Sequence, residues 1–96
     1  MSEIINNTQN LRFEIHLGTE VAYLEYRFYK KDIAFMHTFV PEAFKGKGIA
    51  SQLAQYAFAY AKREKKPVMV YCPFVSKYVK AHPAVKEQLD KEYHKG

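Results

Sequence analysis

The sequence predicts a small mixed α+β domain in which antiparallel strands come first and helices follow. Over most of residues 11–40, apolar and polar residues alternate with the period of half-buried strands. From Ile49 the apolar residues recur at helical spacing instead, and a short apolar run over residues 68–72 follows. With 96 residues, of which 48% are hydrophobic, the chain can build one core of its own.

Three antiparallel strands are expected before the first helix. Residues 1–10 are polar and are interpreted as a loose N-terminal lead-in to a single domain over residues 11–96. The first strand begins at Leu11, the second covers residues 21–29 and the third residues 33–40. The third strand is apolar on both faces except at His37 and Thr38, as expected of a strand in the middle of a sheet.

Helices dominate the second half of the predicted domain. A long helix over residues 49–65 ends in basic residues before Pro67, where cations offset the helix dipole. The crossover from the third strand through this helix to residues 68–72 predicts a right-handed β-α-β unit with parallel strands. Pro73 is expected to open a second helix that reaches about residue 82, and Pro83 a terminal helical piece that reaches about residue 93.

Charge and cysteine content restrict the function classes. The chain has a formal net charge of +5, which favours anionic partners. Its single cysteine, Cys72, cannot form an internal disulfide or a cysteine-based zinc site, and no His/Asp/Glu cluster has metal-ligand spacing, so no metal site is expected. No apolar run is long enough to cross a bilayer, and the N-terminus lacks the pattern of a secretory signal. We therefore expect a cytoplasmic protein with no membrane partner.

The loop before the long helix has the features of an anion site. It ends in Lys45-Gly46-Lys47-Gly48, so that unpaired amide groups and the positive end of the helix dipole meet at glycines that allow a ligand to approach the backbone. An ordinary flexible turn is the alternative interpretation. A P-loop is excluded because Ile49 follows Gly48, and a dinucleotide fingerprint is excluded because Ser51 stands where glycine or alanine is needed.

Two segments resemble a known family. Residues 37–41, His-Thr-Phe-Val-Pro, and residues 45–50, Lys-Gly-Lys-Gly-Ile-Ala, resemble the acetyl-CoA-binding motif of the GNAT superfamily of N-acetyltransferases, Arg/Gln-x-x-Gly-x-Gly/Ala. The run Cys72-Pro73-Phe74-Val75, with Tyr78 and His82-Pro83, narrows the resemblance to its small single-domain members. Lys45 stands where the motif usually has Arg or Gln. The chain also lacks elements that help to form the acceptor site in larger members.

The resemblance implies an acetyl-CoA-dependent N-acetyltransferase whose amine acceptor the sequence does not identify. The pyrophosphate of the cofactor would bind the loop amides, and the pantetheine arm would lie along the third strand, where it parts from its parallel neighbour. The implied cofactor-binding residues are Phe39, Val40, Lys45, Gly46, Lys47, Gly48, Ile49, Ala50, Ser51, Pro73, Phe74 and Lys77.

Three residues are candidates for catalysis. Loss of the proton from a lysine-like amine costs about 4.6 kcal/mol at pH 7, and His37 is the best candidate base, with a structural hydrogen bond as its alternative role. Cys72 ends the neighbouring strand and is expected to approach His37 across the cleft, either as a nucleophile or as channel lining. Tyr78 lies where many GNAT enzymes place the tyrosine that protonates the CoA sulfur, and packing is its alternative role.

Two other classes of function compete with this prediction. A non-catalytic acyl-CoA-binding or interaction module would use the glycine loop without His37, Cys72 or Tyr78. A nucleic-acid-binding domain would need basic residues interleaved with aromatic ones on a sheet face. Tyr23, Arg27 and Tyr29 give only a weak version beside Glu25, so we do not expect nucleic acid as a partner. Monomer and homodimer both remain open, and an exposed edge strand would favour a dimer.

Overall fold

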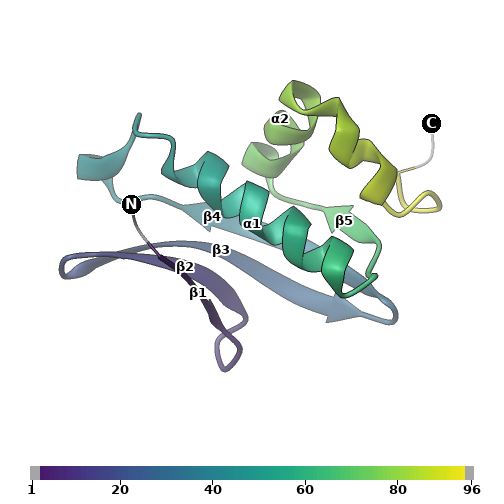
Figure 1. Ribbon diagram of the computed structural model, residues 1–96, viewed down its shortest axis with the longest axis horizontal. Coiled ribbons are helices and arrows are strands. Elements are labelled where there is room, and N and C mark those ends of the chain that lie inside the picture. Colours follow the sequence, from purple (N-terminus) through teal and green to yellow (C-terminus); the bar gives the residue numbers. More distant parts are fainter. Residues whose placement is uncertain (1–2, 95–96) are drawn as a thin grey trace.

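The computed structural model describes residues 3–94, and its helices lie on one face of a five-stranded sheet (Figure 1). The strands follow each other across the sheet in chain order, with β1 to β4 antiparallel and β5 parallel to β4. We call the helix side of the sheet the inner face and the other side the outer face. The elements are β1 (Ile4–Asn7), β2 (Arg12–Leu17), β3 (Glu20–Tyr29), β4 (Asp32–Phe39), η1 (Glu42–Phe44), α1 (Ile49–Arg63), β5 (Val68–Val70), α2 (Pro73–Ala81) and η2 (Pro83–Gln88).

The predicted α+β class is confirmed, but the sheet has one antiparallel strand more than predicted. β1 lies within the segment expected to be a loose lead-in, and it pairs with β2 from Ile4↔Ile15 to Asn7↔Arg12. Its asparagines have specific partners, because the Tyr26 hydroxyl donates to Asn6 Oδ1 at 2.7 Å and Asn7 Nδ2 donates to Glu14 Oε2 at 3.1 Å. Because individual side-chain contacts hold these asparagines in the strand, the sequence of β1 lacks the alternation of apolar and polar residues that would predict it.

The C-terminal segment also differs from the prediction. A 3₁₀ helix, η2, ends at Gln88 instead of continuing as a helix to about residue 93. Leu89 bridges to Val68, the Asp90 N–H donates to the Val68 carbonyl at 2.8 Å, and the Val70 N–H donates to His94 Nε2 at 2.9 Å. The chain leaves the helical path because its backbone and the His94 side chain satisfy the free edge of β5.

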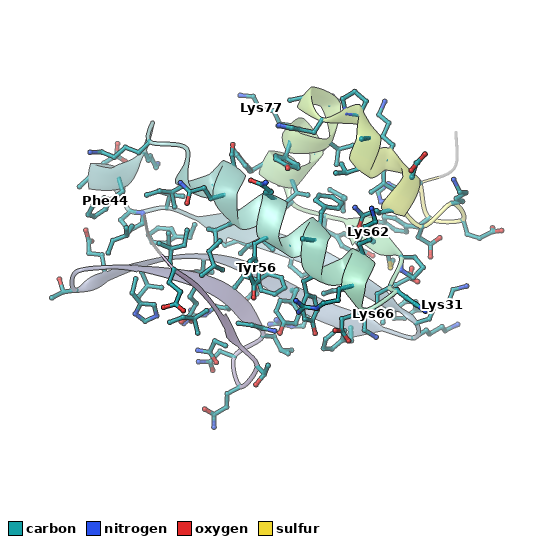
Figure 2. All side chains as sticks on the ribbon, in the orientation of Figure 1. Lys31, Phe44, Tyr56, Lys62, Lys66 and Lys77 are labelled. Atoms are coloured by element: carbon teal, nitrogen blue, oxygen red, sulfur yellow. The ribbon has the colours of Figure 1, made fainter. Side chains whose placement is uncertain are left out.

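Aromatic and small side chains join α1 to the inner face. The Phe13 ring stacks on Tyr26 with centroids 4.6 Å apart and meets the edges of Tyr56 and Tyr60 at 5.3 Å each. Figure 2 shows Tyr56 pointing from α1 toward the sheet. Four residues of α1 that contribute little or no exposed surface, three of them alanines, let the helix lie close to the strands: Leu53, Ala54, Ala57 and Ala61.

The first residue of β4 predicts a pH dependence of stability. Asp32 is only 4% exposed. Burial, together with the neighbouring Asp90 carboxyl, raises the pKa of Asp32 to about 6. An unfolded aspartate releases its proton near pH 3.9, so the folded chain holds a proton that the unfolded chain has lost between these values. The free energy of unfolding therefore decreases as the pH rises from about 4 to about 6.

We expect Asp32→Asn to stabilise the protein above pH 6. Asparagine is uncharged at every pH, whereas Asp32 carries a buried negative charge once it has lost its proton. The gain should reach about 1 kcal/mol or more at pH 7.5, since one pKa unit corresponds to about 1.4 kcal/mol, and it should vanish near pH 4. Urea denaturation at both pH values measures it. Glu20→Gln removes an exposed carboxylate in β3 and serves as the control; an equal gain there would assign the effect to net charge and contradict the prediction.

Candidate functional site

The loop between β4 and α1 ends in two glycines with left-handed backbone. The φ angles are +81° at Gly46 and +76° at Gly48, a region that side chains disfavour. Gly48 is the N-cap of α1, and no side chain caps this helix start. The N–H groups of the first turn, at Ile49, Ala50 and Ser51, have no acceptor within the helix. With the positive end of the helix dipole, they form a set of donors suited to an anion.

A pocket of about 480 Å³ lies beside this helix start. Four elements line it: the end of β4, the glycine loop, the first turn of α1 and the start of α2. Figure 2 shows Phe44, one of the lining residues, at the end of the molecule where this loop lies. The lining residues are Thr38, Val40, Phe44, Lys45, Gly46, Gly48, Ile49, Ala50, Ser51 and Phe74.

β4 and β5 part next to this pocket. Their pairing runs only from Ile33↔Val68 to Phe35↔Val70, and the Phe35 carbonyl then accepts from both Tyr71 N–H at 3.0 Å and Cys72 N–H at 3.1 Å. β4 continues to Phe39, while the other chain segment turns into α2 at Pro73. Beyond Phe35, β4 therefore has no strand partner on its β5 side among the described residues, and this edge could pair with an extended ligand.

A β-bulge decides which side chains of β4 point toward the pocket. Tyr26 pairs with Phe35 but Glu25 pairs with His37, so Met36 is left without a partner on β3. Simple alternation would place His37 on the same face as Phe35. The extra residue reverses the alternation, so that Thr38 lies on the inner face and His37 on the outer face.

The expected approach of His37 to Cys72 is therefore wrong. Cys72 is 3% exposed, and its Sγ lies 3.2 Å from Thr38 Oγ1 on the inner side of β4. His37 is exposed on the outer side, where its ring centroid is 6.2 Å from that of Tyr23. The two residues lie on opposite sides of one strand because of the bulge.

Tyr78 is packed between the two long helices. Its ring stacks on Phe58 of α1 with centroids 5.9 Å apart and on His82, the C-cap of α2, at 4.2 Å. Burial raises the pKa of the Tyr78 hydroxyl. Tyr78 does not line the pocket, so its position matches the packing role that the sequence left as the alternative.

The remaining predicted residues fall into two groups. Eight of the twelve predicted cofactor-binding residues line the pocket, among them Lys45, which also pairs with Glu42 at 3.3 Å on the surface. The other four lie outside the lining: Phe39 faces Tyr23 on the outer face, Pro73 opens α2 as expected, and Lys47 and Lys77 are exposed. Thr38 and Phe44 also line the pocket, and they were not among the cofactor-binding residues predicted from the sequence. Phe44 could have been found as an apolar residue in an otherwise polar loop. Thr38 could not, because the bulge determines the face of β4 on which it lies.

Comparisons with known proteins match the chain to one family and to relatives that share one name. Residues 12–89 match the family described as GCN5-related N-acetyl-transferase. Protein NATD1 of Xenopus tropicalis is 41% identical over 54 residues, 56% of this chain and 50% of that protein. Protein NATD1 of Mus musculus is 33% identical over 81 residues, 81% of this chain and 74% of that protein. Protein NATD1 of Homo sapiens is 38% identical over 54 residues, 56% of this chain and 48% of that protein. The chain thus spans about half the length of the Xenopus and human relatives and about three-quarters of the mouse one.

Two absences hold for residues 3–94, the part of the chain that the structure describes. Within this range, no helix is both long and apolar enough to span a bilayer. Nor do three or more His, Cys, Asp or Glu side chains in this range gather closely enough to hold a metal ion.

Proposed function

Because the chain belongs to the GCN5-related N-acetyltransferase family, we propose that it transfers an acetyl group from acetyl-CoA to an amine. One observation carries this proposal: the uncapped start of α1 and its two left-handed glycines border a pocket of about 480 Å³ beside the unpaired edge of β4. This combination of amide donors and open strand edge suits a ligand with a phosphate end and an extended arm.

The residues present fit such a cofactor. A Cβ atom at Gly46 or Gly48 would meet no heavy atom within 4 Å, so the space in front of this backbone is open. The amides of Ile49, Ala50 and Ser51 would hold the pyrophosphate. The backbone of Thr38 to Val40 would hold the pantetheine arm by hydrogen bonds of the kind that join strands. Acetyl-CoA supplies the activated acetyl group and a thiolate leaving group.

We assign the role of general base to His37. An amine would have to pass the unpaired edge of β4 beyond Phe35, so that the exposed imidazole of His37 lies on its outer side and the pocket on its inner side. His37 accepts the proton that the amine loses as its nitrogen bonds to the acetyl carbon. The proton costs about 4.6 kcal/mol to remove from a lysine-like amine at pH 7, so a group that accepts it must lie within hydrogen-bond reach of the attacking nitrogen.

Cys72 is proposed to support the acetyl end of the channel through Thr38, which lines the pocket while Cys72 itself is buried. A nucleophilic cysteine needs a base within hydrogen-bond reach. Among the described residues, the side-chain partner of the Cys72 thiol is the Thr38 hydroxyl at 3.2 Å, which is not a base. Thiol and hydroxyl are instead two proton-bearing groups on the side of β4 where the CoA thiolate leaves.

Calorimetric titration of the full chain with acetyl-CoA tests the cofactor, and release of the CoA thiol in the presence of amines tests transfer. The amines are a lysine peptide blocked at its N-terminus, a peptide with a free N-terminus, and a polyamine. Saturable binding with amine-dependent thiol release supports the transferase. Binding without release with any amine supports the non-catalytic acyl-CoA-binding module, and absence of binding overturns both.

His37→Ala is expected to lower kcat/KM about a hundredfold at pH 7, the lower end of the range for a general base. Acetyl-CoA binding should be unchanged, because His37 lies on the face opposite the pocket. The pH profile separates this role from a structural one, since the part of the pH dependence of kcat/KM that His37 contributes should disappear in the variant. His16→Ala, another exposed histidine of the sheet, is the control, with thermal melting beside it because His16 also pairs with Glu14 at 2.9 Å; equal loss in both variants at equal stability, or an unchanged profile in His37→Ala, would contradict the assignment.

A further inference from the structure

A second pocket, also of about 480 Å³, lies where α1 ends. Figure 2 shows Lys31, Lys62 and Lys66 at this end of the molecule, opposite Phe44 along the horizontal axis. Three carboxylates also line the pocket, yet no ion pair joins the lysines to any carboxylate of residues 3–94. The lining thus holds more lysines than carboxylates, and Lys31 interacts electrostatically with Asp32 and Asp90. Its lysines are Lys31, Lys62, Lys65, Lys66 and Lys91.

Exposed aromatic rings lie beside these lysines. Tyr29 is 56% exposed, Tyr71 47% and Tyr93 43%, and all three line a neighbouring pocket of about 570 Å³. A smaller pocket of about 250 Å³ contains Tyr29 together with Lys31, so it connects the aromatic and the lysine-lined pockets over the β3–β4 turn. Tyr71 and Tyr93 pack against each other with centroids 5.2 Å apart and Lys30 lies over Tyr29, so the exposed remainder of each ring is the part available for stacking.

Lysines and aromatic rings interleave at this end of the molecule. Lys30 Nζ lies 5.5 Å from the centroid of Tyr29, and Lys66 Nζ lies 5.1 Å from that of Phe28. The rival class of nucleic-acid-binding domains required this mixture on one surface, and along the sequence it was only faintly visible. The fold assembles it from the β3–β4 turn, the end of α1 and the segment after η2.

We propose that this end of the molecule binds single-stranded nucleic acid, through lysine contacts to phosphates and stacking of bases on the exposed rings. Single strands present both groups at once, whereas a duplex hides the faces of its bases. An acidic polypeptide would engage the lysines and leave the rings unused. The surface lies at the other end of a molecule 40 Å long from the candidate acetyl-CoA pocket, so this proposal is independent of the transferase.

Fluorescence anisotropy of a labelled oligothymidylate, titrated with the full chain at about 50 mM salt and then at rising salt, tests the proposal. The triple variant Lys31→Ala, Lys62→Ala, Lys66→Ala should flatten the slope of log K against log salt by about 2, because single strands contribute about 0.7 per phosphate contact. Tyr29→Ala should weaken binding about tenfold through lost stacking. Lys80→Ala, an exposed lysine of α2, is the control and should bind as the unaltered chain does.

Thermal melting checks that each variant is folded. We expect every variant to keep its fold, because the substituted side chains are exposed or half-buried. Absence of saturable binding at low salt would overturn the proposal, as would equal losses in Lys80→Ala. Displacement of the oligonucleotide by acetyl-CoA would assign binding to the other pocket and also overturn it. If polyglutamate competes equally well and Tyr29→Ala has no effect, the site is one for acidic polypeptides and the proposal is wrong.

Discussion

Replacing Gly48 with valine is expected to weaken acetyl-CoA binding by more than about a thousandfold, which corresponds to the loss of about two charge-assisted hydrogen bonds. Gly48 holds the left-handed backbone that starts α1 and directs the first amides toward the pocket. A β-branched residue resists this conformation, so the loop must change its path or hold a strained one. In either case the valine methyl groups occupy the open space in front of the amides. Calorimetric titration with acetyl-CoA measures the loss.

Gly18→Val is the matched control for this variant. Gly18 lies in the turn between β2 and β3 with a φ of +66°, and a Cβ there would also meet no atom within 4 Å. Both variants should lose about 1–2 kcal/mol of stability through the same backbone strain. Only Gly48→Val should lose acetyl-CoA binding. Tight binding by Gly48→Val, or an equal loss in Gly18→Val, would remove the glycine loop from the cofactor site.

Phe13→Ala is expected to reduce the free energy of unfolding by about 3–5 kcal/mol, a large part of the stability of a domain of this size. Phe13 is fully buried and contacts three aromatic rings, Tyr26 from the sheet and Tyr56 and Tyr60 from α1. Its removal leaves a cavity that these rigid rings cannot fill. Urea denaturation followed by circular dichroism measures the change.

Phe39→Ala makes the same substitution at a ring that is 44% exposed in the same sheet. Its stability should change by less than about 1 kcal/mol, because little apolar contact is lost at the surface. A loss at Phe13 no greater than that at Phe39 would mean that the layer between sheet and α1 does not control folding.

The sequence predicted the elements whose side chains alternate or recur with a regular period, and it missed those stabilised by individual contacts. β2 to β4 and α1 follow from their apolar patterns. β1 does not, because its asparagines replace apolar residues and are satisfied by Tyr26 and Glu14. The segment after η2 was expected to be helical, because nothing in the sequence shows that its backbone completes the edge of β5.

In the candidate site, backbone geometry was predictable and side-chain direction was not. Glycines between a strand and a helix identify a loop with free amides, and this prediction does not depend on the register of the strands. The face on which His37 lies depends instead on the bulge at Met36, which one extra residue creates and which no local pattern reveals. Tyr78 shows the same limit, since many positions on a helix can pack against a neighbour and only the fold shows that Phe58 is there.

The two edges of the sheet show that the segment that matches the family and the folding unit have different boundaries. Residues 12–89 match the acetyltransferase family, yet β1 on one edge and residues 90–94 on the other lie outside that match. A chain trimmed to the matching residues would keep the whole candidate pocket while exposing unpaired amides and carbonyls of β2 and β5. Exposed strand edges of this kind pair with neighbouring molecules, so such a trimmed chain would tend toward fibres or aggregates.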